Sequence, residues 1–198
     1  KLNGIDDIVQ IVSKLGKLLK YSLNNKKDFV HVYEEVRVVE SYISIQKIRY
    51  NDKFDATIDI NEDIMSCKIP KFIIQPIIEN AIIHGIEDKV GKAHLFIRGW
   101  QEDHKIFFEI KDDGVGMSEE KLNRIRSLMQ SQGSGNADRE SIGISNVDKR
   151  IKLYYGGEYG LTLQSRQNSG TVALISLPFN TSVRDYGGQA DDDSSSGG

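Results

Sequence analysis

The stretch IFFEIKDDGVGM, residues 106–117, places a hydrophobic run directly before two acidic residues and two glycines. The apolar run predicts a strand that ends near Asp112. Gly114 and Gly116 allow positive φ angles and a close approach of the backbone to a flat ligand. The carboxylate of Asp112 can accept a hydrogen bond from an exocyclic amine such as that of adenine. Taken alone, the same stretch is equally consistent with an acidic glycine turn.

The segments around this stretch alternate between strand and helix patterns. Period-two patterns and turn residues predict strands over about 54–60, 93–100, 105–111, 160–166 and 171–177. Three- and four-residue spacing predicts helices over about 2–23, 32–50, 70–84 and 145–155, and one that opens at Ser118. Because hairpin-length connections join several strands, we expect an α/β two-layer sandwich: an N-terminal helix, then a mixed or antiparallel sheet with helices on one face.

Composition excludes several classes of protein. The chain has 198 residues, a formal net charge of -3 and a pI near 5.9, which argues against nucleic acid as the main partner. It contains no run of roughly 18 uncharged apolar residues, so we expect no transmembrane segment in it. Its single cysteine, Cys67, excludes an internal disulfide framework and fits a reducing cytosol.

A second candidate stretch is IQPIIENAIIHG, residues 74–85. Its apolar residues form one stripe, and Asn80 and His84, four apart, lie together at the edge of that stripe. An Asn oxygen that faces a pocket can bind Mg²⁺, which prefers one or two protein ligands plus phosphates. His84 could meet phosphate oxygens. The alternative is that both side chains satisfy backbone groups near a helix end.

Two further segments have the residue types of ligand-binding loops. Residues 141–147 (SIGISNV) follow a Gly/Ser-rich stretch and open a helix, whose free N–H groups form an anion site. Gly143 permits a tight turn there. Residues 168–171 (NSGT) begin the last strand, where Thr171 could place a hydroxyl near a ligand. A loop-to-helix junction and a simple hairpin turn are the alternatives for these two segments.

The order and spacing of these four pieces resemble the catalytic ATP-binding domain of sensor histidine kinases, in the GHKL superfamily. Residues 74–85 resemble its N box, 112–117 its DxGxG box, 141–147 its second glycine box and 168–171 its GxGT box. The variety that it resembles is the LytS/YesM-like group of bacterial membrane sensor kinases, on the phrases LLKYSLNN (18–25), YISIQKIR (42–49), IPKFIIQPIIENAIIHG (69–85) and NVDKRIKLYYG (146–156). The resemblance covers about residues 1–178 and implies a Bergerat-type ATP-binding fold.

The resemblance also implies a role for each site residue. Asp112 would bind the adenine amino group, with Thr171 assisting directly or through water. Gly114 and Gly116 would let the backbone pass the nucleotide. Asn80 would hold Mg²⁺, and His84 would lie near the phosphates. Residues 131–140 would form the ATP lid, with Gly143 as its hinge and with Gly143 and Ile144 beside the nucleotide.

Three departures from the family pattern bear on the chemistry. Ser141 and Asn168 stand where the family often has glycine, which motivates an alternative: a degenerate nucleotide-binding or dimerisation module without kinase activity. The water-activating ATPases of the superfamily carry a Glu one helical turn before the Mg²⁺-binding Asn, where this chain has Pro76. Glu79 would point about 100° away on a helix. A missing base favours phosphoryl transfer to a protein over hydrolysis, although an ATPase of the same superfamily remains the third hypothesis.

The resemblance implies how the chain is organised and what it works with. Residues 1–27 would be the second helix of a dimerising hairpin, 28–180 the catalytic domain, and 181–198 a disordered tail. The acceptor-histidine motif of the family is absent from the sequence, and we expect His31, His94 and His104 to be surface or strand residues. The expected partners are ATP or ADP, the acceptor hairpin, a response regulator and a second copy of the full-length protein. We expect this chain to be a cytoplasmic domain of a bacterial inner-membrane sensor.

Overall fold

The computed structural model describes residues 4–23, 28–130 and 139–179. Its five-stranded sheet has the order β2-β4-β5-β7-β6. The strands are β2 (Phe54–Ile60), β4 (Ala93–Glu102), β5 (Lys105–Asp112), β7 (Thr171–Pro178) and β6 (Gly160–Ser165). β2 and β4 pair in parallel, and every other neighbouring pair is antiparallel. The mixed, mostly antiparallel sheet predicted from the sequence is therefore confirmed.

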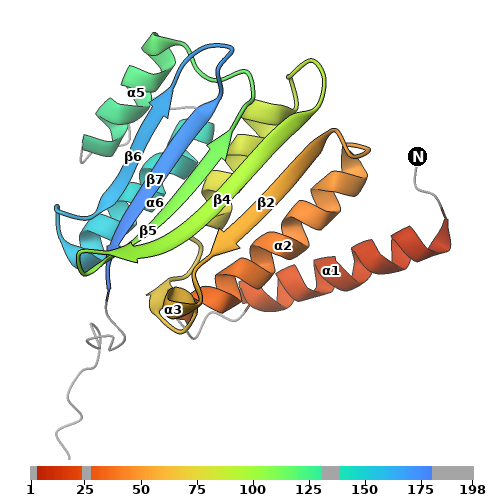
Figure 1. Ribbon diagram of the computed structural model, residues 1–198, viewed down its shortest axis with the longest axis horizontal. Helices are drawn as coiled ribbons and strands as arrows, with labels where there is room; N and C mark the ends of the chain where they lie inside the picture. The colour runs from red at the N-terminus through yellow and green to blue at the C-terminus, as the bar shows by residue number, and fades with distance from the viewer. Residues whose placement is uncertain (1–3, 24–27, 131–138, 180–198) are drawn as a thin grey trace, which may run out of the picture.

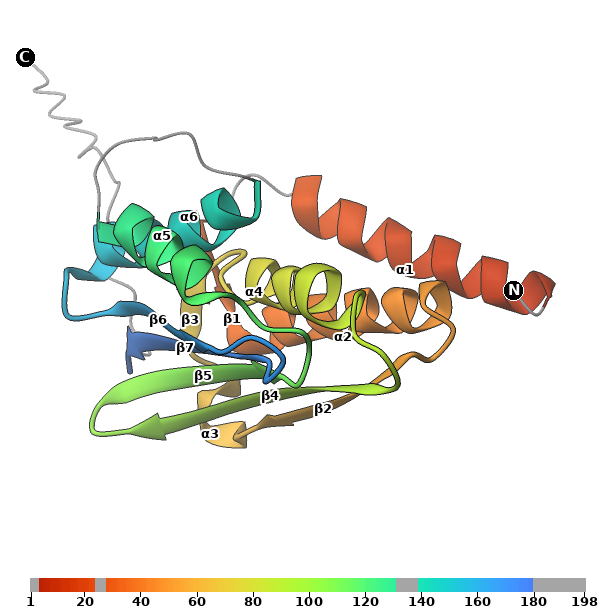
Figure 2. The same ribbon diagram turned by 90° about the horizontal axis from the view of Figure 1, so that it is seen from above.

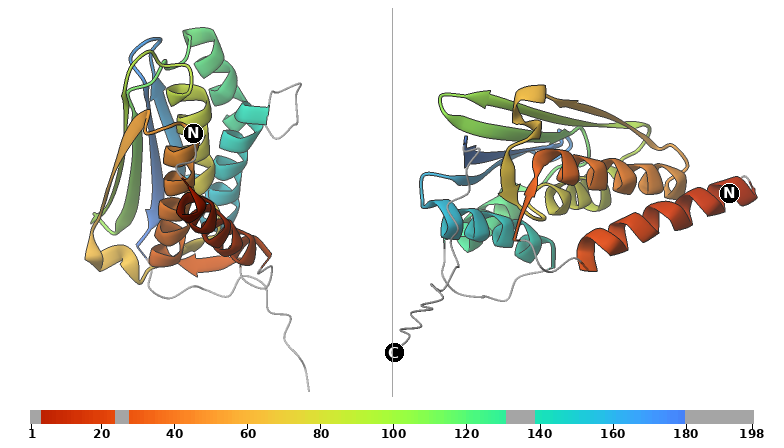
Figure 3. Two further views of the ribbon diagram at one scale, coloured as in Figure 1. Left: turned by 90° about the vertical axis from the view of Figure 1, so that its right-hand side faces the viewer. Right: turned by 90° about the horizontal axis from the view of Figure 1, so that it is seen from below.

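The long helices lie on one side of the sheet. These are α2 (Val32–Arg49), α4 (Gln75–Asn80) with the π-helical turn η1 (Ala81–Ile86), α5 (Glu119–Gln130) and α6 (Arg139–Tyr155). Seen edge-on, they form one layer against the sheet (Figures 2 and 3). The core between the two layers is apolar and includes Phe54 and Phe108, both fully buried. The two-layer sandwich is thus confirmed as well.

Strand alternation decides which residues enter this core. In β5, Ile106, Phe108 and Ile110 are buried, while the residues between them are partly exposed. Because side chains alternate at period two, Asp112 follows the same inward register as these three apolar residues. Thr171 pairs directly with Asp112 across β5 and β7 and is also buried. The strand alternation therefore places the side chains of Asp112 and Thr171 on the helix-covered face, at one end of the sheet.

Helix α1 (Ile5–Leu23) packs against α2 and not against the sheet (Figure 1). Several of its apolar side chains are exposed, including Val12, Leu15, Leu19 and Leu23. None of the helices in the described ranges combines the length and the apolarity needed to cross a bilayer.

The structure corrects the predicted helix over residues 70–84. Residues Lys68–Pro70 form a short strand, β3, that pairs antiparallel with β1 (Phe29–His31), so the helix begins only at Gln75. A short helix, α3 (Glu62–Met65), precedes β3. Sequence spacing missed β1 and β3 because each has three residues, too short for a period-two pattern.

The helix predicted from Ser145 begins earlier, at Arg139. Gly143 consequently lies inside α6 and not in a turn that leads into it, which contradicts its expected place at the start of the helix. The predicted lid, residues 131–140, lies mostly outside the described residues, as does the predicted tail. Ser118 opens α5 as expected, since its hydroxyl oxygen accepts a hydrogen bond from the amide of Lys121 at 3.3 Å.

Candidate functional site

Asp112 ends β5 with its side chain under the helix layer, where it is only 3% exposed. One carboxylate oxygen, Oδ1, accepts a hydrogen bond from the amide of Gly114 at 2.8 Å. Burial raises the pKa of this carboxyl to about 6, because an ionised group loses hydration there. Asp112 is therefore an acceptor placed in an apolar environment, as adenine recognition requires.

The chain after Asp112 is pressed against the end of the π-helical turn. The amide of Val115 donates to the carbonyl of Gly85 at 2.8 Å. A Cβ at Gly114 would lie 2.1 Å from that same carbonyl oxygen, so the contact tolerates only glycine. Gly116 has a φ of +62°, a left-handed conformation that favours glycine. Both glycines are thus required by the path of the backbone, before any ligand is considered.

The turn between β6 and β7 supports the same loop. The amide of Asn168 donates to the carbonyl of Val115 at 2.6 Å. Ser165 accepts a hydrogen bond from the amide of Met117 at 2.9 Å, and its hydroxyl lies 2.9 Å from the hydroxyl of Thr171. Asp112, Thr171 and Ser165 therefore form one connected polar end of the sheet.

Asn80 approaches this end from the helix layer. It is the last residue of α4, and the π-helical turn η1 begins directly after it. The oxygen Oδ1 of Asn80 is buried, and no hydrogen-bond donor within the described residues reaches it. A buried polar atom without a partner is destabilising and often marks a ligand position. π-helical turns are likewise frequent at functional sites.

Two adjoining cavities meet at Asn80 and His84. The first is a narrow cleft lined by Asp112, Thr171 and Lys121, among others, and its volume of about 10 Å³ suits about one water. The second, of about 230 Å³, lies between α4 and α6. Since a purine is much larger than a water, adenine can enter the first only if its walls separate.

The structure brings the predicted site residues together. Asn80, His84, Asp112, Gly116 and Thr171 line the narrow cleft, and Asn80, His84, Gly143 and Ile144 line the larger cavity. Gly114 lies behind the cleft, against Gly85. The roles of the predicted site residues in nucleotide binding stay predictions. His31, His94 and His104 lie at the end of β1, in β4 and in the turn after β4, as expected.

The sequence interpretation did not assign three lining or supporting residues to the site: Glu79, Ser165 and Lys121. Glu79 lines the larger cavity beside Asn80, and Gln75 donates to its carboxylate at 2.7 Å. Although Glu79 is expected to point about 100° from Asn80 on the helix, both residues line this cavity because it extends around them to Pro76. Ser165 could have been found by pairing the last two strands, since it lies opposite Thr171. Lys121 had no local signal.

The donor set fits a magnesium ion that is bound jointly by the protein and by phosphate. Asn80 offers a single neutral oxygen, and Mg²⁺ is typically held by one or two protein ligands, waters and substrate phosphates. No cluster of three or more His, Cys, Asp or Glu side chains suited to a metal occurs in the described ranges. A protein-only metal cage is therefore not what this part of the chain offers.

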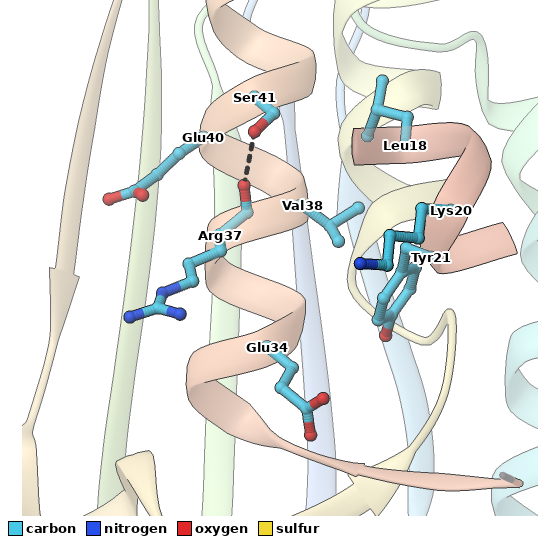
Figure 4. Close-up of a pocket in the computed structure, with 8 residues that line it drawn as sticks. All are labelled: Leu18, Lys20, Tyr21, Glu34, Arg37, Val38, Glu40 and Ser41. Carbon is cyan, nitrogen blue, oxygen red and sulfur yellow. Dashed lines mark hydrogen bonds between the residues drawn. The ribbon is translucent and has the colours of Figure 1, made fainter. Parts of the chain in front are cut away.

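A larger cavity than these two, of about 540 Å³, lies elsewhere, between α1 and α2. Figure 4 shows its lining, which includes Lys20 and Tyr21 of α1 and Glu34 and Arg37 of α2. None of the predicted site residues lines it. Size alone therefore does not identify the functional site in this molecule.

Comparison with known proteins gives a consistent result along the chain. Residues 69–181 match the HATPase_c family, described as histidine kinase-, DNA gyrase B- and HSP90-like ATPase. Residues 2–54 match the His_kinase family. The chain is 32% identical over 183 residues to the sensor histidine kinase YesM of Bacillus subtilis, covering 92% of this chain and 30% of that protein. It is 30% identical over 169 residues to the sensor protein kinase HptS of Staphylococcus aureus, covering 85% of this chain and 32% of HptS.

Solved structures of histidine kinases share the fold. The nucleotide-free catalytic domain of histidine kinase ThkA superposes with a TM-score of 0.55 at 16% identity, covering 77% of this chain and 98% of that one. The histidine kinase domain of a blue-light activated kinase from Erythrobacter litoralis gives a TM-score of 0.54 at 12% identity, covering 86% and 74%. The chain spans about a third of the length of the curated relatives that it matches.

Proposed function

The chain belongs to the sensor histidine kinases of the YesM type with a HATPase_c catalytic domain, and from this premise we propose that it binds Mg·ATP and transfers the γ-phosphoryl group to a protein histidine. One observation carries the proposal. The buried carboxylate of Asp112 and the unsatisfied Oδ1 of Asn80 reach the same cleft from the sheet and from the helix layer. A purine acceptor and a magnesium ligand are thereby held on opposite walls.

Each residue of the cleft has a part in holding the nucleotide. Asp112 accepts the hydrogen bond of the adenine amino group, and Thr171, its cross-strand neighbour, assists directly or through water. Asn80 would hold Mg²⁺ by its side-chain oxygen, and His84, which lines the same cavity, would lie near the phosphates. Gly143 and Ile144 of α6 form the opposite wall of the larger cavity, next to the phosphate end.

The chemistry demands positioning more than covalent participation by this chain. When bound, Mg²⁺ would neutralise the charge that develops on the phosphate oxygens. Asn80 and His84 fix the position of the triphosphate, and Asp112 fixes the base, so that the γ-phosphorus faces an incoming imidazole nitrogen. The bond from the imidazole nitrogen to phosphorus forms while the bond to the β-phosphate oxygen breaks, and ADP leaves.

The full-length protein would supply what this chain lacks. We propose that residues 1–27 are the second helix of a dimerising hairpin, that residues 28–180 are the catalytic domain and that residues 181–198 are a tail. The acceptor histidine would lie N-terminal to residue 1, in a membrane-anchored bacterial sensor that acts as a homodimer. A response regulator would then receive the phosphoryl group. The related kinase ThkA has been crystallised in complex with the response regulator protein TrrA, which supports this last step.

The first test is calorimetric titration with ADP and Mg²⁺ of the wild type and of Asp112→Asn. Losing a charge-assisted hydrogen bond in a buried site costs roughly 1.5–3 kcal/mol, so affinity should fall about 10- to 100-fold. Asp113→Asn is the matched control, since Asp113 pairs with Lys89 outside the cleft. Equal affinity of wild type and Asp112→Asn would contradict the proposed role of Asp112.

The second test supplies a separate hairpin fragment that carries an acceptor histidine. With labelled ATP, label should appear on that fragment and be acid-labile, as expected of a phosphohistidine. A chain that binds ADP but never labels the hairpin would instead be a degenerate binding module. This outcome separates the two hypotheses without changing the nucleotide site.

One observation favours ATP hydrolysis as a second candidate function. Glu79 lines the larger cavity beside Asn80. A carboxylate is therefore present in this cavity although Pro76 cannot act as a base. Its hydrogen bond from Gln75 holds it as an acceptor. Steady ATP hydrolysis that Glu79→Gln removes would support this function, whereas hydrolysis at background level in the wild type would exclude it.

A further inference from the structure

A cluster of polar contacts around one buried carboxyl joins α1, α2, α6 and the segment before α4. It consists of Tyr21 of α1, Glu35 of α2, Lys71 and Phe72 of the segment before α4, and Arg150 of α6. Glu35 lies at its centre and is fully buried. Burial raises the pKa of the Glu35 carboxyl, while its hydrogen bonds and the nearby Arg150 oppose that rise. None of these residues belongs to the nucleotide site proposed above.

The carboxylate of Glu35 holds the chain where it enters α4. Its Oε1 accepts a hydrogen bond from the amide of Phe72 at 2.7 Å. Its Oε2 accepts one from the amide of Ile74 at 3.3 Å, and Ile74 is the residue directly before the helix. A negative charge at this end of a helix is favourable. Glu35 thus fixes the start of the helix whose last residue is Asn80.

Phe72 has a conformation that needs such support. Its φ is +60°, in the left-handed region that bulky residues rarely adopt. Its amide is held by Glu35, and its carbonyl accepts a hydrogen bond from the guanidinium of Arg150. Because Arg150 lies on α6, Phe72 connects α6 to the segment that leads into α4, and these two helices line the larger cavity.

Tyr21 brings α1 into the same cluster. Its hydroxyl donates to Oε1 of Glu35, and its backbone carbonyl accepts a hydrogen bond from the ammonium of Lys71. Its ring meets the ring of Phe72 edge-on, with centroids 5.1 Å apart. Figure 4 shows Tyr21 on the side of α1 that faces α2. The first helix therefore contacts Glu35 by a hydroxyl, and the segment before α4 by a carbonyl and a ring.

We propose that Glu35 is a positioning residue for the nucleotide site, and that it joins α1 to the helix bearing Asn80 through Tyr21. A displacement of α1 would withdraw the Tyr21 hydroxyl and change the position of Phe72 and of the α4 start. The phosphate and metal end of the site would respond, whereas Asp112, on β5, would not. The choice of Mg·ATP as the ligand rests on the proposed function, whereas the contacts among Tyr21, Glu35 and Phe72 are independent of it.

The test compares two ligands and one structural readout in the 198-residue chain. Calorimetry measures affinity for Mg·ATP, which spans both ends of the site, and for adenosine, which reaches only the base end. We expect Glu35→Gln to lower Mg·ATP affinity about 10-fold and Tyr21→Phe about 3-fold, a range typical of residues that act at a distance. Adenosine affinity should change less than about 2-fold, because Asp112 lies on a separate element.

Hydrogen exchange of residues 75–86 is the structural readout. In Tyr21→Phe it should quicken while exchange in β4 and β5 stays as in the wild type, and in Glu35→Gln it should quicken by a larger factor than exchange in β4 and β5 does. Glu40→Gln and Tyr33→Phe are the matched controls, since both residues lie on α2 outside the cluster, and neither should change either measurement. If Glu35→Gln does not fold, Tyr21→Phe alone decides, because it removes one hydroxyl and leaves the ring.

The outcomes separate this inference from the proposed function. Equal losses of Mg·ATP and adenosine affinity would overturn it, as would a loss of Mg·ATP affinity without faster exchange in residues 75–86. Unchanged affinity and exchange in folded variants would overturn it as well. If the wild type binds neither ligand, the proposed function fails, and exchange in Tyr21→Phe still decides the positioning role.

Discussion

Two polar side chains with buried oxygens differ in how those oxygens are hydrogen-bonded. Glu35, in the cluster between α1, α2 and α6, has hydrogen bonds to both of its carboxylate oxygens. Asn80, at the nucleotide site, keeps a buried oxygen that no donor in the described part of the chain satisfies. Both belong to the same stretch of structure, because Glu35 holds the start of α4 and Asn80 ends it.

The difference distinguishes a structural cluster, around Glu35, from a binding site, around Asn80. A satisfied buried group contributes to folding, and its loss destabilises the fold. An unsatisfied one, such as Oδ1 of Asn80, costs folding free energy and becomes favourable only when a ligand arrives. Changes in the cluster should therefore lower stability, whereas changes in the site should lower binding and leave stability equal or higher.

The largest expected effect is a pH dependence of stability that comes from Asp112. Its pKa rises from 3.8 to about 6 on folding, so between these values the folded state holds a proton that the unfolded state has lost. Stability should therefore fall as pH rises from about 4 to above 6, by about 3 kcal/mol at most. The measurement is the free energy of unfolding in urea, for wild type and Asp112→Asn, across this range. Parallel curves for the two proteins would contradict the burial of an ionisable Asp112.

The next effect is on ligand binding, through Asn80. Asn80→Ala removes the metal ligand, and we expect Mg·ATP affinity to fall about 100-fold, near the upper limit for one contact with a charged group. Thermal stability should not fall by more than a degree or two, because Oδ1 has no hydrogen bond to lose. Calorimetry and thermal melting check the two halves of this prediction. A marked loss of stability would show that Asn80 is a structural residue.

Glu35 should behave in the reverse manner. Glu35→Gln places an amide donor against the amides of Phe72 and Ile74, so we expect the free energy of unfolding to fall by about 2 kcal/mol. Denaturant unfolding measures it, with Glu40→Gln as an exposed control on the same helix. A variant as stable as the wild type would contradict the structural role of Glu35, and with it the contrast between Glu35 and Asn80.

The smallest effect concerns a departure from the family pattern. Asn168, which stands where glycine is frequent, has a φ of +61°, a conformation that Asn tolerates better than most residues. We expect Asn168→Gly to change stability by less than about 0.5 kcal/mol and Asn168→Val to lower it by about 1–2 kcal/mol. Nucleotide affinity of Asn168→Gly should equal that of the wild type. A gain in affinity would instead support the view that Asn168 impairs the site.

Local patterns were sufficient for much of the fold and the site. The alternation of β5 predicts that Asp112 shares the face of Ile106, Phe108 and Ile110, and the structure places it there. The bounds predicted for β2 also agree with the structure. Where the pattern depended on long-range pairing, prediction was wrong: Pro70 belongs to β3 because it pairs with Phe29, and no spacing near Pro70 shows this.

The sequence by itself determined the family, the order of the main elements and the residues that converge on the cleft, because strand alternation and motif spacing are local properties of the chain. Only the tertiary structure decided that Glu79 lines the cavity, that Gly143 lies within a helix and that Glu35 joins Tyr21 to the start of α4. These depend on which segments meet across the core. Glu35 and Ile74 lie 39 positions apart in the chain, and neither segment carries a local sequence pattern that indicates their hydrogen bond.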